Sequence, residues 1–251
     1  MAVSVLSMGM VANADEYGPT VCDDSWNSPV LEAYDDSEWS FPTFIGDPAD
    51  YDQYLGALMD VCFRNDSQAF VALGLGTAED ATLIYNTVIY DAGGDFDAFD
   101  TEFESLFGVK CPETLKNDLQ VLMAQLLGSA RYAVVGCEPQ ADGTYQVTVI
   151  YEQLQIFKPL MEVYMATISD MAETWFSNYT SMPDEGELMI QILNAYCNSM
   201  RICLDNATYA EPAITTVSIQ QEDGIYQPDM EEFGNLIYLL FDTNSLVELL
   251  D

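Results

Sequence analysis

The spacing of apolar residues changes once along the chain, near residue 130, and this change restricts the fold more than any other feature. From Asp47 to Gly128, apolar side chains recur every three or four residues, which is the spacing of one face of a helix. From Tyr132 to Ile156 they alternate with polar side chains, which is typical of a strand with one buried face. The chain is therefore expected to be an α+β protein with a helix-rich first half.

Local start and stop signals divide the first half into helices. Asp47-Pro48 is typical of an N-cap followed by proline at the first helical position. It predicts a helix from Asp47 to Cys62. The stretch Thr77 to Asp80 has the spacing of a capping box and predicts a second helix start. Further helices are expected from Asp95 to Phe107 and from Cys111 to Gly128.

The second half mixes strand and helix patterns. A hairpin is predicted from Tyr132 to Ile156, with its turn at Glu138 to Gly143. A second hairpin is expected where the strand Ala213 to Gln220 turns at Glu222-Asp223-Gly224 into Ile225 to Gln227. Helices are predicted at Phe157 to Tyr179, Glu185 to Tyr209 and Glu231 to Phe241. The apolar stripes of the first two of these helices are interpreted as core.

The helix at Asp47 to Cys62 and the hairpins at Tyr132 to Glu152 and Thr215 to Gln227 resemble those of secreted bacterial proteins of unknown function with a cystatin-like or nuclear-transport-factor-2-like fold. This likeness spans roughly residues 47 to 245. It implies a curved antiparallel sheet, built from two hairpins, that wraps around a helix as a cone. Members of such folds serve as ligand pockets, dimerisation modules or small enzymes, so the resemblance implies no single function. The two long helices between the hairpins depart from the pattern.

The charge of the chain excludes several classes of function. There are 42 Asp and Glu residues against 6 Lys and Arg, which gives a net charge of -36, and there is no histidine. Nucleic acids and anionic lipid headgroups are bound through clusters of Lys and Arg, so no nucleic-acid partner is expected. Histidine is the usual base of Ser and Cys nucleophiles and the commonest metal ligand. Triad hydrolases and histidine-dependent metal sites are therefore excluded.

The N-terminal segments predict export. Residues 1–14 are apolar and small and end in Ala12-Asn13-Ala14, which resembles the core and cleavage site of a secretory signal without its basic leader. The alternative is a short N-terminal helix of the mature domain. Residues 15–46 contain three prolines and no regular period, and they predict an extended arm. Residues 47–251 are expected to form a single α+β domain, and no run long enough for membrane insertion follows.

The cysteines leave two interpretations open. An even set of six is compatible with disulfides in an oxidising compartment, and free buried cysteine is the other interpretation. There is no C-x-x-C motif, so zinc and thioredoxin-like sites are not predicted. The six are Cys22, Cys62, Cys111, Cys137, Cys197 and Cys203.

Two kinds of chemical site are considered. Calcium prefers carboxylate oxygens, and the densest acidic run supplies the candidates Asp91, Asp95, Asp97 and Asp100. This run lacks the glycine at the sixth position that an EF-hand loop needs. A steroid-isomerase type of enzyme would need one buried acid and a tyrosine donor, and no histidine. The tyrosines that fit are Tyr132, Tyr145, Tyr151 and Tyr226.

The sequence as a whole predicts a non-enzymatic binding or interaction protein, secreted or at the cell surface, with an unknown protein or small molecule as partner. No cofactor is expected, with calcium as the one candidate ion. Two alternatives stay open: a pocket protein that binds a small molecule or calcium, and a carboxylate–tyrosine enzyme. A closed apolar pocket with one convergent acid and tyrosine would favour the alternatives, and a flat exposed aromatic patch would favour a protein partner.

Overall fold

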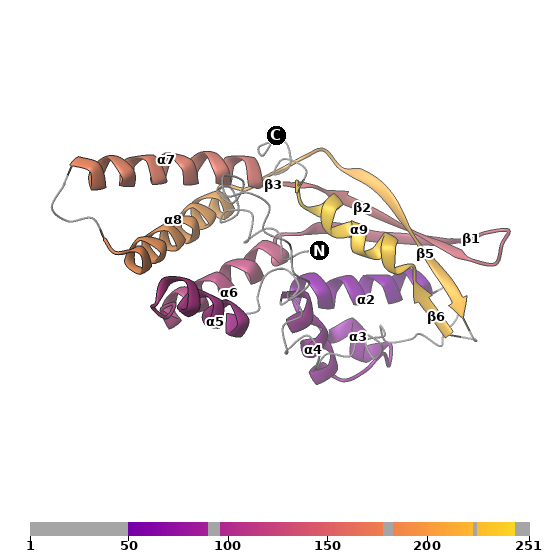
Figure 1. The fold of residues 1–251 in the computed structure, drawn as a ribbon. Helices are drawn as coiled ribbons and strands as arrows, with labels where there is room; N and C mark the ends of the chain where they lie inside the picture. Colours follow the sequence, from indigo (N-terminus) through magenta and orange to yellow (C-terminus); the bar gives the residue numbers. More distant parts are fainter. Residues whose placement is uncertain (1–49, 90–95, 178–182, 223–224, 244–251) are drawn as a thin grey trace, which may run out of the picture.

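A computed structural model describes residues 50–89, 96–177, 183–222 and 225–243 (Figure 1). The predicted signal segment, the predicted arm and the predicted cap at Asp47-Pro48 lie outside the described residues. The first described helix, α2, spans Tyr51–Arg64 and has Asp50 at its N-cap position.

The sheet confirms the predicted α+β class and its construction from two hairpins. Its four strands lie in the order β1-β2-β5-β6, and every neighbouring pair is antiparallel. The first hairpin pairs β1 with β2, the second pairs β5 with β6, and the central β2–β5 pairing joins them. The sheet is not closed into a barrel, because β1 and β6 stay at its two edges. The strands are β1 Arg131–Pro139, β2 Tyr145–Glu152, β5 Ala213–Glu222 and β6 Ile225–Pro228.

The predicted helices of the first half are present. The capping box is formed as expected: the Thr77 N–H donates to Asp80 Oδ2 at 2.8 Å, and the Asp80 N–H donates to Thr77 Oγ1 at 3.2 Å. These hydrogen bonds hold the pKa of the Asp80 carboxyl below its usual value. The remaining helices of this half are α3 Gln68–Ala72, α4 Ala78–Ile89, α5 Phe96–Phe107 and α6 Glu113–Gly128.

The main core lies between one face of the sheet and the helices α2 and α9 (Met230–Leu240), which both pack on that face (Figure 1). The alternation in β2 and β5 turns Val147, Val149, Val217 and Ile219 toward these helices, and none of the four is exposed to solvent. The alternation in this stretch of sequence therefore gives β2 one buried face, as predicted. Burying such side chains supplies about 1.5–3 kcal/mol each before the entropy cost of ordering them.

A β-bulge in β1 keeps this strand in register with the core. Val134 pairs with Val149, but Cys137 pairs with Val147, so β1 has one extra residue between the two pairs. Gly136 lies in this extra segment with φ +76°, a left-handed conformation that glycine adopts without steric cost. Because of the bulge, Val134 and Cys137 both face the core although they are three residues apart.

Two predicted boundaries are wrong for one reason. The second strand was expected to continue to Ile156, and the second long helix to Tyr209. Instead β2 ends at Glu152, and β3 (Leu154–Gln155) pairs with β4 (Thr208–Tyr209) in a separate two-stranded sheet. The α-helices between these strands are α7 Phe157–Ser177 and α8 Glu185–Asp205. The α9 helix also begins one residue before the predicted Glu231.

Candidate functional site

The helices α7 and α8 form a hairpin that extends away from the sheet (Figure 1). Among the described elements, α7 packs chiefly against α8, while α8 also packs against α5 and α6. An ion pair of 2.6 Å between Arg201 and Asp118 joins α8 to α6. The hairpin is therefore held to the body mainly through α8, and beyond its first turn α7 is the outer layer.

Local interactions fix the geometry of this hairpin. The Asp184 carboxylate accepts the Glu187 N–H at 2.8 Å and caps the N-terminus of α8. The rings of Tyr164 on α7 and Tyr196 on α8 meet edge to face, with 5.8 Å between their centroids. Burial raises the pKa of the Tyr196 phenol, so this ring stays neutral in the contact.

The expectation that the apolar stripe of α7 is core proves wrong for most of its length. Only Phe157 and Leu160, in its first turn, are buried. Farther along, Met165 is 56% exposed and Phe176 is 63% exposed. Single exposed apolar residues are ordinary on a protein surface, but here they continue along a helix that has α8 as its main neighbour.

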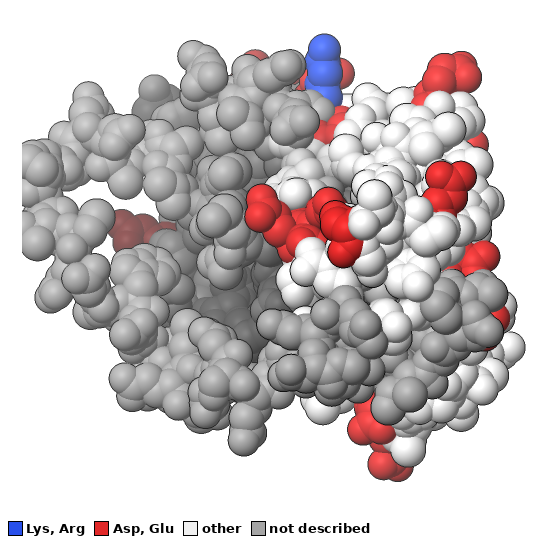
Figure 2. All heavy atoms as spheres, turned by 90° about the vertical axis from the view of Figure 1, so that its right-hand side faces the viewer, with Lys and Arg blue, Asp and Glu red and all other residues white. Residues whose placement is uncertain are grey.

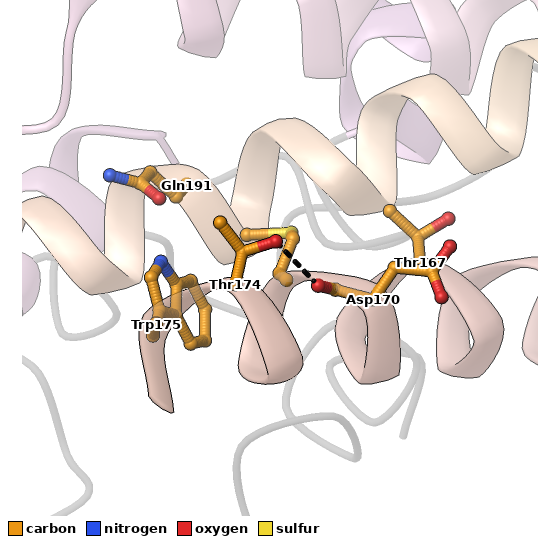
Figure 3. Close-up of a pocket in the computed structure, with 6 residues that line it drawn as sticks. Thr167, Asp170, Thr174, Trp175 and Gln191 are labelled. Atoms are coloured by element: carbon orange, nitrogen blue, oxygen red, sulfur yellow. Dashed lines mark hydrogen bonds between the residues drawn. The ribbon is translucent and has the colours of Figure 1, made fainter. Parts of the chain in front are cut away.

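A shallow groove of about 320 Å³ runs between the two helices (Figure 3). Thr167 and Asp170 lie toward one end of it, and Trp175 and Gln191 lie at the other. The Thr174 hydroxyl donates to the main-chain carbonyl of Asp170 at 2.9 Å, so the Asp170 carboxylate is not used in that bond. The groove is lined by Thr167, Asp170, Met171, Thr174, Trp175 and Gln191. It offers a flat aromatic ring, a flexible thioether and a carboxylate within one site.

The calcium candidates are not gathered into a site by the described residues. Asp91 and Asp95 lie outside the described residues. Asp97 and Asp100 lie in α5, and their side chains are likewise outside the description. Among the side chains that the structure does describe, no three Asp, Glu or Cys residues are placed to hold a metal ion together. The run stays a candidate for calcium binding.

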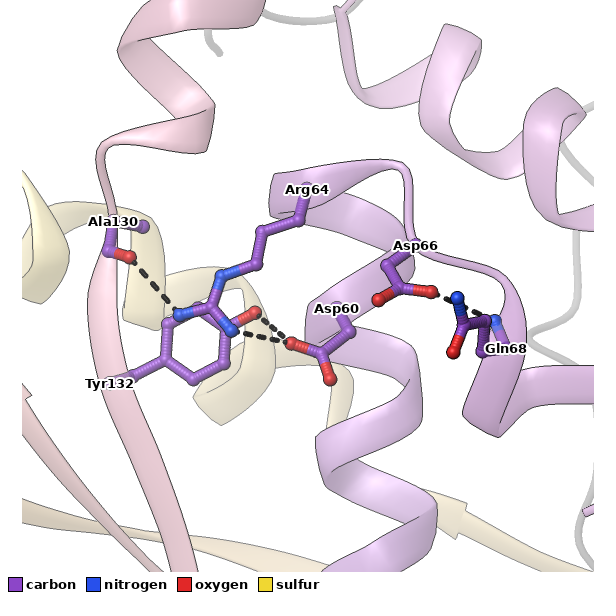
Figure 4. A network of polar contacts seen from close by, with 6 residues as sticks. All are labelled: Asp60, Arg64, Asp66, Gln68, Ala130 and Tyr132. Atoms are coloured by element: carbon purple, nitrogen blue, oxygen red, sulfur yellow. Dashed lines mark hydrogen bonds and ion pairs between the residues drawn. The ribbon is translucent and has the colours of Figure 1, made fainter.

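One predicted tyrosine does meet a carboxylate, in a network that joins α2 to β1 (Figure 4). The Tyr132 hydroxyl donates to Asp60 Oδ1 at 2.7 Å, and Arg64 donates to the same oxygen at 3.0 Å. The Arg64 guanidinium also lies over the Tyr132 ring, 4.2 Å from its centroid. Burial, followed by the hydrogen bond to Asp60, raises the pKa of Tyr132. Because these side chains bind one another, the network fixes β1 to α2 and has a structural role.

Two other predicted tyrosines form an aromatic cluster at the start of α2. The Tyr51 ring lies 4.8 Å from Tyr145 and 4.9 Å from Tyr226, measured between centroids. Burial and the neighbouring Tyr226 raise the pKa of Tyr51. The last candidate, Tyr151, pairs across the sheet with Tyr132 and packs on the core. The four predicted tyrosines are therefore divided between two separate packing clusters.

The surface charge is predominantly negative. Five of the six Lys and Arg residues form ion pairs with acids, each within 3.5 Å. Lys158, at the start of α7, is exposed. Figure 2 shows acidic side chains spread over the face formed by the free end of the sheet, with basic atoms at its upper edge. Most of the 42 acids have no cation to pair with, because so few cations exist.

Trp175 and Gln191, the residues at one end of the groove, are not among the site residues predicted from the sequence. The signal was present: α7 has apolar residues on more of its circumference than one helix contact can cover. That excess was interpreted as core.

No family model and no curated protein matches the sequence. Among solved structures, the crystal structure of a "putative lipoprotein (ycdA)" from Bacillus subtilis matches with 15% identity and a TM-score of 0.45. The match covers 77% of this chain and 56% of that one. Similarity at this level does not establish a shared fold. Within the described ranges, no helix has both the length and the apolar content needed to cross a membrane.

Proposed function

We propose that this protein is a non-enzymatic interaction protein that works outside the cell, either secreted or at the cell surface, and that the α7–α8 hairpin contacts a protein partner. The observation that carries the proposal is the exposure of Met165 and Phe176 on a helix whose main described neighbour is α8. A projecting apolar helix face is a common way for one protein to bind another. The signal-like residues 1–14 support export, and the likeness to secreted cystatin-like bacterial proteins belongs to the same proposal.

The alternatives receive less support from the geometry. The groove between α7 and α8 is shallow and open, whereas small-molecule sites enclose most of their ligand. In the described tyrosine–carboxylate pair, Tyr132 and Arg64 both donate to the same oxygen of Asp60, so this carboxylate is already occupied by groups of the protein. No cofactor forms part of the proposed function.

Site-specific photo-cross-linking tests the proposal directly. A photoreactive amino acid is placed at Phe176, and in a separate variant at Val135, which is 43% exposed and lies on β1, in the sheet and not in the hairpin. Irradiation of the source cells should give a discrete protein adduct from position 176 and none from position 135. The absence of an adduct at 176, or the same adducts from both positions, would contradict a partner surface on the hairpin.

A further inference from the structure

The two ends of the α7–α8 groove differ in chemistry. At one end the exposed carboxylate of Asp170 lies beside Thr167, and at the other the Trp175 ring lies beside Gln191 (Figure 3). Met171 lies between them in the lining. A ligand that fills this groove therefore needs a positive group for one end and an apolar or flat group for the other.

The surroundings of the groove are anionic. The segments 157–177 and 183–205 together contain seven acidic and two basic residues. One of the two bases, Arg201, is already paired with Asp118, and no described Lys or Arg forms an ion pair with Asp170. The other acids of α7, Glu162 and Glu173, are exposed. The field at the groove is therefore negative, in a molecule of net charge -36.

We infer that the groove between α7 and α8 receives a basic amphipathic segment of the protein partner, with a Lys or Arg side chain on Asp170 and an apolar side chain on Trp175. This inference rests on the proposed function and adds the chemistry of the partner. Charge complementarity favours a cationic partner for two reasons. The negative field speeds its diffusional association, and its cation forms a charge-assisted hydrogen bond with the carboxylate. A second copy of this chain would instead bring a further charge of -36 to the same surface.

The fluorescence of Trp175 can report binding at the groove. The chain has three tryptophans, so replacing Trp26 and Trp39 by phenylalanine leaves Trp175 as the single emitter. The probe is a synthetic helical peptide with one face of Leu and one face of Lys, titrated into the full chain. Binding should change the Trp175 emission and should weaken steeply as salt is raised from about 0.05 to 0.5 M. A peptide with Glu in place of Lys should not bind.

Matched variants separate the groove from general attraction to an acidic protein. Asp170→Asn and Glu138→Gln each remove one negative charge, but Glu138 lies in the sheet, next to the last residue of β1. Asp170→Asn should weaken binding of the Leu/Lys peptide by about tenfold, the effect of losing one good charge-assisted contact. Glu138→Gln should change it less than twofold, within the range expected for a distant charge at moderate salt. Trp175→Ala, followed by calorimetry, should also weaken binding by about tenfold.

The outcomes distinguish this inference from the function on which it rests. If the two charge variants weaken binding equally, or if a Lys/Ser peptide binds as well as the Leu/Lys peptide, attraction is non-specific and the inference is wrong. If binding is non-specific in this way but position 176 still gives a discrete cross-link, the hairpin remains a partner surface and only the basic character of the partner is wrong. Sedimentation that shows a dimer, lost in Phe176→Asp, would show a second copy in place of the basic segment.

Discussion

The carboxylate of Asp242 accepts the backbone N–H of Phe157 at 3.1 Å, across 85 residues of sequence, and so caps α7 from beyond the end of α9. The same Oδ1 atom accepts the Ile156 N–H at 3.0 Å, and Asp242 is only 5% exposed. The Asp242 N–H in turn donates to the Leu154 carbonyl at 3.1 Å. A negative charge at a helix N-terminus is favourable, so this contact fixes where the projecting hairpin begins.

Replacing Asp242 tests that cap. Asp242→Ala should lower the free energy of unfolding by about 1–3 kcal/mol, because two buried N–H groups lose their acceptor. Asp242→Asn should cost less, because the amide oxygen still accepts. Urea titration followed by circular dichroism measures both, with the exposed Glu211→Ala as a control expected within about 0.5 kcal/mol of the unchanged protein. Equal losses in Asp242→Ala and the control would show that the cap is not formed.

The contact between Tyr132 and Asp60 predicts a measurable coupling. Tyr132→Phe keeps the ring over which Arg64 lies and removes the hydroxyl, so it should cost about 0.5–1.5 kcal/mol of stability. In a double-mutant cycle with Asp60→Asn, the two losses should be non-additive by at least about 0.5 kcal/mol. Additive losses would mean that the two side chains do not interact in solution.

Replacing two glycines by alanine should change the stability of the protein in opposite directions. Gly136→Ala should destabilise by about 1–2 kcal/mol, because its φ of +76° is unfavourable for a residue with a Cβ atom. Gly234→Ala should stabilise by about 0.5–1 kcal/mol, because Gly234 lies within α9 and an added Cβ meets no atom within 4 Å. Thermal melting of the two variants decides the matter. Destabilisation in both would contradict the described geometry of α9.

Alkaline pH should unfold the protein through its buried thiols. Burial raises the pKa of Cys62 to about 12 and that of Cys197 to about 11. In the unfolded chain these thiols ionise near about 8.5. The folded state therefore favours the neutral thiols, and their contribution is complete below pH of about 8.5 and is lost as pH rises above it. Each thiol can remove up to about 1.4 kcal/mol per pH unit.

Urea midpoints measured from pH 7 to about pH 10 test this dependence, because the ordinary pKa of tyrosine, about 10, lies at the upper end of that range. Alkylation at pH 8 provides a second measurement. Cys137 is only partly buried and should react before Cys62 and Cys197, which should react only on unfolding. A flat stability profile, or rapid labelling of Cys62 in the folded protein, would be inconsistent with the burial of these thiols.

The excess of acids predicts a response to ions. Screening of like charges should raise the melting midpoint as NaCl is added, because self-repulsion at -36 destabilises the compact state. CaCl₂ at matched ionic strength should add no further shift, since the run from Asp91 to Asp100 lacks the pattern of a calcium loop. A distinct extra increase with calcium, absent with magnesium, would instead establish a calcium site.

Features whose partners lie close in sequence could be predicted. The capping box at Thr77 and Asp80 closes over three residues, and the inward stripe of α6 follows from helical spacing alone. Both hairpins and the turn of the first could also be predicted, because a strand that alternates and then meets Asp-Gly has few other structures to adopt. For these elements, local geometry and side-chain chemistry were sufficient.

The sequence by itself determined the α+β class, most helix and strand positions, and a surface that must be anionic. Only the tertiary structure decided that Asp242 caps α7, that Leu154–Gln155 leaves β2 to pair with Thr208–Tyr209, and that α7 leaves an apolar face exposed. These features depend on contacts between segments roughly 50 to 85 residues apart. An apolar helix has the same pattern whether its second face meets the core or the solvent, and only the packing of α8 against α6 determines which.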